Sequence, residues 1–193
     1  MRRQSLHFDR VLSASLCLAA SFGLAAGCSS SRKSDVASPS RPSNSPWVAR
    51  AAIDARSGSS LNGSALFTES DGSVRVLVMV SGASPGKHAV HVHEKGDCSD
   101  AEANNAGGHF NPDSHKHGAP GVTEHHAGDF GNVEVGSDGS GRLELTAGDI
   151  TVRPGPRSIV GRAIVVHAMP DDFVSQPAGN AGGRVGCGVI RAE

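Results

Sequence analysis

The sequence has no tyrosine, a single tryptophan and no surplus of positive charge. Its 18 lysines and arginines are balanced by 19 aspartates and glutamates, so the formal net charge is -1, and nucleic acid is not indicated as a partner. No window carries the long apolar stripe of an amphipathic helix. Glycine, by contrast, is abundant, with 25 among 193 residues. Many glycines without helical periodicity predict strands joined by turns.

Residues 1–28 predict an export signal. Three arginines precede an apolar stretch over residues 11–26 that is too short and too rich in serine for a transmembrane helix. The stretch ends in LAAGC, which resembles a bacterial lipobox, where the signal peptide is cleaved and the cysteine, here Cys28, is acylated. A lipobox usually has leucine three residues before the cysteine, where this chain has Ala25. The alternative is an ordinary signal peptide with a chance cysteine.

Residues 29–46 are rich in serine and proline and nearly free of apolar side chains. Such a segment cannot bury a core, so we expect a flexible tether. A tether after an acylated Cys28 would hold a folded domain, residues 47–193, away from a membrane. Ser29 is not the aspartate associated with inner-membrane retention, which favours an outer-membrane lipid anchor on an exported protein of the periplasm or cell envelope.

Eight short β-like runs follow the tether. Several alternate apolar with polar residues, and turn signals such as Asp71-Gly72 separate them. The runs cover residues 47–55, 64–70, 73–82, 87–94, 130–137, 141–148, 158–168 and 183–192. This pattern predicts an all-β domain, an eight-stranded antiparallel sandwich or barrel.

Histidines are concentrated in one part of the chain, since eight of the ten lie between His88 and His126. In a strand, residues two apart face the same side, so His91 and His93 in HVHEKGDC should project together, about 7 Å apart along the strand. That spacing suits two nitrogen ligands of one metal. An isolated H-x-H pair, however, is more often a surface or packing pair.

The segment 94–129 breaks the rhythm of strands, and a loop this long in a compact domain is usually functional or stapled. It carries further candidate ligands, and one more histidine ends a late strand. These residues are His109, His115, His117, His125, His126, Asp129 and His167. Histidine with aspartate suits zinc, and several imidazoles suit copper. The clustering therefore predicts a metal site rather than a solvated polar loop.

Six motifs together resemble the copper/zinc superoxide dismutase family, most closely its bacterial exported members. They are HAVHVHEKGDC, GGHFNP, HGAP, HHAGDFGNV, VGRAIVVHAMPDD and GNAGGRVGCGVI, in family order, between about Trp47 and Ile190. The resemblance implies a Greek-key β-sandwich or barrel with long metal-binding loops. It also implies bound copper and zinc, and the disproportionation of superoxide to oxygen and hydrogen peroxide.

The same resemblance implies a role for each candidate. Copper would be held by His91, His93, His109 and His167, and zinc by His109, His117, His126 and Asp129. The shared His109 would bridge the metals as an imidazolate, leaving copper and taking a proton when copper is reduced. The HGAP and HxGD frames select His117 and His126, so His115 and His125 are expected to be surface residues and His88 a structural one.

Three further assignments rest on the resemblance. Asp171 matches a carboxylate that links a copper histidine to a zinc histidine, although alone it would be taken for a solvated residue. Cys98 and Cys187 match the family disulfide, which would pin the loop that presents the metal ligands. Arg184 matches the arginine beside copper, which would attract superoxide and hold it by hydrogen bonds.

Two other functions are open at this stage, a copper-delivery or metal-buffering domain and a structural lipoprotein with a vestigial site. Relatives of the first kind typically lack copper ligands or the guiding arginine, whereas this sequence has four ligand candidates and Arg184. The expected partners are superoxide as substrate and a membrane through Cys28. A monomer and a homodimer are both compatible with the sequence.

Overall fold

The computed structural model of the protein describes residues 45–193. The expected signal peptide with Cys28 lies outside the described residues, as do residues 29–44 of the expected tether. The described part contains nine strands and one short 3-10 helix. They are β1 (Trp47–Ala55), β2 (Asn62–Ser70), β3 (Ser73–Ser81), β4 (Gly86–His93), η1 (Asn104–Ala106), β5 (Asp129–Val135), β6 (Gly141–Ala147), β7 (Ala163–His167), β8 (Arg184–Val189) and β9 (Arg191–Ala192).

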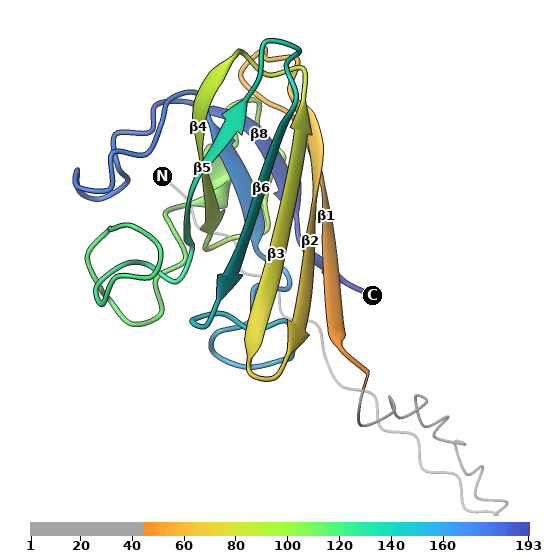
Figure 1. Ribbon diagram of the computed structural model, residues 1–193, viewed down its shortest axis with the longest axis vertical. Coiled ribbons are helices and arrows are strands. Elements are labelled where there is room, and N and C mark those ends of the chain that lie inside the picture. The colour runs from red at the N-terminus through yellow and green to blue at the C-terminus, as the bar shows by residue number, and fades with distance from the viewer. Residues whose placement is uncertain (1–44) are drawn as a thin grey trace, which may run out of the picture. The chain divides into compact units, whose positions relative to one another are not determined.

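Eight of the strands close into an antiparallel barrel (Figure 1). Around the ring the order is β1-β2-β3-β6-β5-β4-β7-β8 and back to β1, while the two-residue β9 adds to β1. Two strands lie between β3 and β4, and two between β6 and β7, which is a Greek-key topology. The predicted all-β Greek-key fold is confirmed, and each of the eight predicted runs overlaps a strand.

The barrel has few residue pairs between strands at two places. Among the described strands, β5 and β6 are joined by a single residue pair, Val135 with Gly141, and β8 meets β1 over two residue pairs. The ring therefore behaves as two four-stranded sheets that face each other, β1-β2-β3-β6 and β5-β4-β7-β8. Phe67 of β2 and Phe130 of β5 pack across the interior with their ring centroids 6.5 Å apart.

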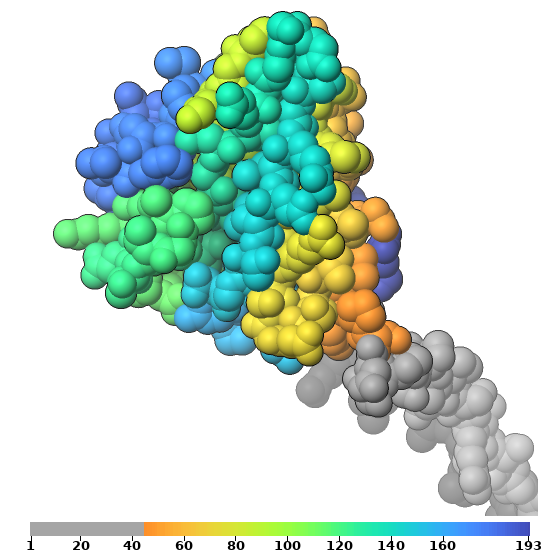
Figure 2. Space-filling view, in the orientation of Figure 1, coloured from red at the N-terminus to blue at the C-terminus, as the bar shows by residue number. Residues whose placement is uncertain are grey.

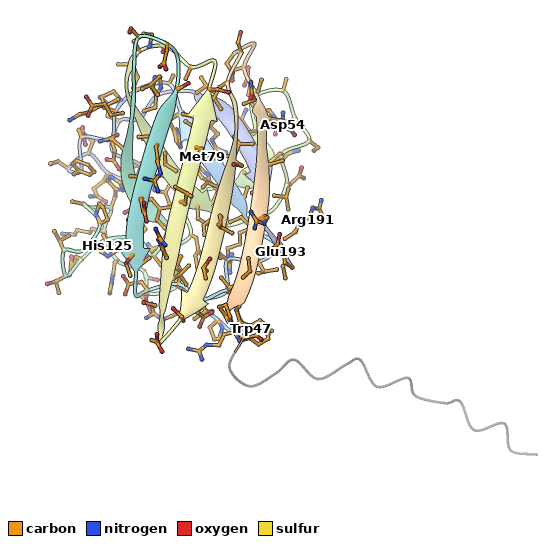
Figure 3. All side chains as sticks on the ribbon, turned by 45° about the vertical axis from the view of Figure 1, so that its right-hand side comes forward. Trp47, Asp54, Met79, His125, Arg191 and Glu193 are labelled. Carbon is orange, nitrogen blue, oxygen red and sulfur yellow. A yellow bond between two sulfur atoms is a disulfide. The ribbon has the colours of Figure 1, made fainter. Side chains whose placement is uncertain are left out.

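Alternation explains why these segments form strands, and β3 shows it most clearly. Its four valines face the core and are at most 4% exposed, whereas Met79 projects from the outer face (Figure 3). Each buried valine stabilises the fold by about 1.5–3 kcal/mol relative to an exposed one. A slip of one residue would exchange the valines with Arg75, Leu77 and Met79, so burial determines the register.

Two irregular segments carry the residues of interest. Residues 94–128 join β4 to β5 and, within the described chain, contain only η1 as regular structure apart from isolated bridges, as predicted for the long loop. Residues 168–183 join β7 to β8. Both segments project from the same side of the barrel in Figure 1. No helix within residues 45–193 has the length and apolar character that a membrane span requires.

Candidate metal centre

β4 and β7 lie side by side in the sheet and supply three histidines. The register places His91 and His93 opposite β7, and it places His167, the last residue of β7, opposite Arg184 of β8. All three histidine residues are at most 4% exposed. The sheet pairing thus brings residues more than 70 positions apart in the sequence to one face of the sheet, the face opposite to core residues such as Val92 and Val166.

The long loop returns to β4 between these histidines. His109 forms an isolated bridge with His93, and the N–H of Val92 donates to the carbonyl of Gly128 at 2.9 Å. A Cβ at residue 128 would lie 2.3 Å from the Val92 carbonyl oxygen, so this close approach requires glycine. These contacts place His109, in the middle of the loop, and Asp129, the first residue after it, beside the histidines of β4.

Two groups of four side chains form around His109. The first contains His91, His93, His109 and His167, and the second contains His109, His117, His126 and Asp129. In each group, one ligand atom from every residue lies within 4.8 Å of the others. The structure therefore brings together both sets named from the sequence, with one histidine shared between them.

Hydrogen bonds on the outside of the first group determine which ring nitrogen faces inward. His91 donates from Nε2 to Asp171 Oδ2 at 2.8 Å. His93 and His167 each donate from Nδ1 to a backbone carbonyl, at 2.9 and 3.3 Å. A neutral imidazole has one N–H, so the opposite nitrogens carry lone pairs. His93 Nε2 and His167 Nε2 are 3.3 Å apart, and two lone pairs at this distance favour a cation between them.

The second group is built around Asp129. His109 Nδ1 lies 2.8 Å from Asp129 Oδ1 and 3.4 Å from His126 Nδ1. His117 donates from Nε2 to Asp171 Oδ1 at 2.9 Å. Its Nδ1 lies 3.0 Å from Asp129 Oδ2 but lacks the alignment of a hydrogen bond. Asp171 therefore contacts one histidine of each group, as expected from the sequence.

Three buried ring nitrogens have no hydrogen-bond partner among the described residues, namely His91 Nδ1, His109 Nε2 and His117 Nδ1. A buried polar atom left unsatisfied costs about 1–3 kcal/mol, and these three belong to the two groups. Four nitrogens suit copper, whereas three nitrogens and one carboxylate complete a tetrahedral zinc site. The donors therefore fit copper on one side of His109 and zinc on the other.

The two groups differ in charge. Burial lowers the pKa of His93 to about 2 and that of His109 to about 4, and it also lowers the pKa of His167. Burial opposes a charge on His117 as well, but the neighbouring carboxylates outweigh it and raise the pKa of His117 to about 9. At neutral pH a metal therefore meets uncharged His93, His109 and His167 in the first group, whereas in the second group it displaces the extra proton of His117.

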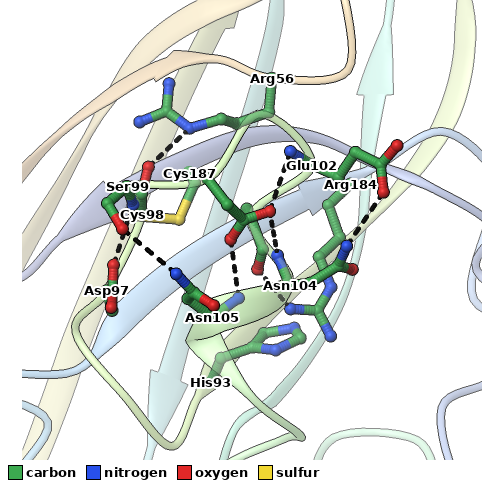
Figure 4. Close-up of a disulfide and its surroundings, with 12 residues drawn as sticks. Arg56, His93, Asp97, Cys98, Ser99, Glu102, Asn104, Asn105, Arg184 and Cys187 are labelled. Atoms are coloured by element: carbon green, nitrogen blue, oxygen red, sulfur yellow. Dashed lines mark hydrogen bonds between the residues drawn. A yellow bond between two sulfur atoms is a disulfide. The ribbon is translucent and has the colours of Figure 1, made fainter.

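Arg184 lies beside the first group and is held by the loop that follows β4. Its terminal nitrogens donate to the carbonyls of Ala103 at 2.5 Å and Gly107 at 2.7 Å. The Gly107 carbonyl also accepts from His93, and Figure 4 shows the guanidinium next to that histidine. The half-buried Arg184 is therefore oriented by the same carbonyl that orients a histidine of the first group.

Cys98 and Cys187 form the expected disulfide (Figure 4), which joins the loop after β4 to β8 across a sequence separation of 89. In the chain-entropy model, a cross-link over this length stabilises the fold by about 4.5 kcal/mol. The cross-linked loop supplies the carbonyls that hold Arg184. The disulfide thus limits the movement of both the loop and the arginine.

The comparisons with known proteins identify the family. The family model of copper/zinc superoxide dismutase (SODC) matches residues 61–190, more than half of the chain. The chain belongs to the copper/zinc superoxide dismutase family. It is 48% identical over 128 residues to the Cu-Zn superoxide dismutase 2 of Brassica juncea, covering 63% of this chain and 83% of that protein. The crystal structure of the clock protein EA4 is similar at a TM-score of 0.70 and 38% identity, covering 79% of this chain and 98% of the other.

This superoxide dismutase therefore uses copper and zinc and converts superoxide into oxygen and hydrogen peroxide. The matched residues include both histidine groups, both disulfide cysteines and Arg184. The predictions of family, enzyme class and cofactors are confirmed.

Three histidines of the cluster lie outside both groups. His115 is exposed, as expected. The side chain of His125 is only 11% exposed, so the prediction of a surface residue was wrong for it. Its Nε2 lies 3.2 Å from Asp149, and its Nδ1 donates to the carbonyl of His126 at 2.8 Å. His88 is buried, and its Nδ1 contacts a backbone carbonyl at the end of β7 at 2.8 Å, as a structural residue would.

Sequence reasoning missed the residues that support the site from behind. The side chain of Asn132 on β5 makes two hydrogen bonds with the backbone of Asp171, at 2.7 and 3.0 Å. Asp100 accepts the backbone N–H groups of three residues in the next turn, which shapes the loop that holds Arg184. The position of Asn132, at the end of the HHAGDFGN motif, was a usable signal. Nothing in the sequence around Asp100 indicated its role.

Proposed function

We propose that copper is held by His91, His93, His109 and His167, and zinc by His109, His117, His126 and Asp129. The position of His109 carries this assignment. Its Nδ1 faces Asp129, while its buried Nε2 has no partner within residues 45–193, and its ring centroid lies 4.0 Å from that of His91. An imidazole can serve two metals only when both of its nitrogens are free of protons, and the buried carboxylate and histidines around His109 support that arrangement.

The residues divide the reaction between them. When bound, copper supplies the one-electron chemistry that turns two superoxide anions and two protons into one oxygen and one hydrogen peroxide. His109 holds a proton at Nε2 between the two half-reactions. Its Nδ1 stays within the zinc group, so the ring keeps its orientation while Nε2 exchanges that proton.

Arg184 binds the substrate anion. The loop carbonyls engage one N–H at each terminal nitrogen and so define the plane of the guanidinium. The remaining N–H groups can donate to superoxide beside the copper group. Because the guanidinium is charged at any physiological pH, it also attracts the anion from solution.

Metal analysis with a dismutation assay on residues 29–193 tests this function. We expect one copper and one zinc per chain, and a rate that is lost on removal of copper and restored by copper but not by zinc. Copper binding without dismutation would instead favour a copper-delivery or metal-buffering domain. A folded protein that retains neither metal would favour a structural lipoprotein with a vestigial site.

We also propose that the enzyme acts outside the cytoplasm, in the periplasm or cell envelope. The Cys98–Cys187 disulfide supports this location, because disulfides persist in oxidising compartments and are rare in the cytosol. The basic and apolar character of residues 1–28 supports export as well. The LAAGC motif and the Ser/Pro-rich residues 29–46 support acylation of Cys28 and an outer-membrane anchor.

Cys28→Ala is expected to move the protein from the membrane fraction to the soluble exported fraction, or to leave an uncleaved precursor. The substitution removes the sulfur atom that would carry the lipid, and with it most of the membrane affinity. Fractionation and mass spectrometry of the N-terminus measure the result. Cys17→Ala, which alters the apolar run but not the lipobox, should behave as the unsubstituted protein. An unmodified N-terminus downstream of Cys28 would contradict the lipoprotein assignment.

A further inference from the structure

The side chain of Gln176 forms a two-bond clamp on the backbone of His117. The N–H of His117 donates to Gln176 Oε1 at 2.9 Å, and Gln176 Nε2 donates to the carbonyl of His117, also at 2.9 Å. A side-chain amide that both donates to and accepts from one residue restricts the rotation of that residue's backbone. Gln176 lies in the segment after β7, 59 positions from His117.

The segment that carries Gln176 is closed on itself. Asp172 Oδ1 accepts the backbone N–H groups of Val174 and Ser175, at 2.9 and 2.8 Å. The N–H of Asp172 donates to the carbonyl of Gly179 at 3.0 Å, and the N–H of Gly179 donates to that of Ser175 at 2.7 Å. Hydrogen bonds within the loop therefore restrict the backbone on either side of Gln176.

The same loop lies directly against the hydrogen bond between His117 and Asp171. Gly179 has a φ of +64°, and a Cβ there would lie 2.0 Å from Asp171 Oδ1 and 2.6 Å from His117 Nε2. Residues 171–179 thus approach His117 at its ring through Asp171 and at its backbone through Gln176. Figure 2 shows the two segments, residues 109–128 in green and the segment after β7 in blue, packed side by side.

His117 needs such support because regular structure does not supply it. Within the described chain it belongs to the irregular part of the long loop, outside every strand and outside η1. A metal ligand on an irregular loop keeps its position only if other groups hold it, and removal of such supporting groups typically weakens metal binding by about 10–100-fold.

We propose that Gln176 is a positioning residue for zinc, because it fixes the backbone of His117 and so slows the loss of the metal. This inference rests on the proposed role of His117 as a zinc ligand. The segment after β7 would then support zinc binding in a second way, through Gln176 on the backbone of His117, in addition to the hydrogen bond of Asp171 to the His117 ring.

The test compares zinc loss from the fully metallated protein in excess chelator. Gln176→Ala and Gln176→Met should each lose zinc about 10–100 times faster than the unsubstituted protein, while copper content at early times is unchanged. Methionine matches the length of glutamine but cannot make either hydrogen bond. A methionine variant that retained zinc normally would show that the side chain acts by packing alone, which overturns the proposal.

Asn111 offers a matched control in the loop that carries His117. Its side chain makes the same two-bond clamp on the backbone of His115, at 2.8 and 3.0 Å, but His115 belongs to neither metal group. Asn111→Ala should therefore retain zinc like the unsubstituted protein. Zinc loss from Asn111→Ala as fast as from the Gln176 variants would mean that any loosening of the loop releases the metal, and would overturn the specific role of Gln176.

Two further measurements separate this inference from the assignment beneath it. Cobalt bound in place of zinc should show an altered visible spectrum in Gln176→Met, because a displaced ligand changes the coordination geometry. His117→Ala, tested alongside, should lose zinc faster than any Gln176 variant. If His117→Ala retains zinc, the ligand assignment fails and the inference fails with it. If His117→Ala loses zinc while both Gln176 variants retain it, only the inference fails.

Discussion

Replacing His109 with alanine is expected to reduce superoxide dismutation to about the rate of the uncatalysed reaction in solution and to weaken the retention of both metals. His109 is the side chain that the two groups share. Its loss leaves the copper group with three histidines and the zinc group with two histidines and Asp129. It also removes Nε2, the atom at which we place the proton between half-reactions. Metal analysis after dialysis, together with stopped-flow assays of superoxide decay, measures both effects.

His115→Ala is the control for this prediction. His115 lies six residues further along the same loop but is exposed and belongs to neither group, so activity and metal content should be unchanged. If His115→Ala lost zinc while His117→Ala retained it, the zinc ligand in this part of the loop would be His115 and the assignment of His117 would be wrong. An active, fully metallated His109→Ala would exclude the bridging role.

Arg184→Glu is expected to lower the second-order rate by about one to two orders of magnitude while copper content is unchanged. The substitution reverses a charge opposite His167 in the sheet register without removing a proposed ligand. It also removes the N–H groups that would hold superoxide. The effect should be large in this chain because residues 168–183 contain two aspartates and no lysine. The local attraction must therefore come from copper, Arg184 and the lysines of the long loop.

The dependence of the stopped-flow rate on salt separates guidance by Arg184 from a general change in charge. Lys116→Gln, on the exposed surface of the long loop, should have a smaller effect that is visible mainly at low ionic strength, because an exposed charge is screened more strongly. An unchanged rate in Arg184→Glu with full copper would show that this arginine does not guide or bind the substrate.

The sequence by itself determined the fold class and the candidate ligands of this protein. Alternation carries this information, because valines at every second position of residues 73–81 can be buried in only one register. The motifs around His91, His117 and His167 indicate the proposed ligands, because the family resemblance distinguishes them from neighbours such as His115. The burial of His125 was not predicted, because its contact with Asp149 joins two loops and leaves no local pattern in the sequence.

Only the tertiary structure decided how these residues act on one another. Which ring nitrogen of His91 faces inward depends on Asp171, 80 positions away. The orientation of Arg184 depends on the Ala103 and Gly107 carbonyls, 81 and 77 positions away. The clamp of Gln176 on His117 is likewise a contact between two loops. Sequence patterns report the periodicity of one segment. A hydrogen bond between two distant segments depends on how the barrel places those segments relative to each other, and that arrangement is a property of the folded chain.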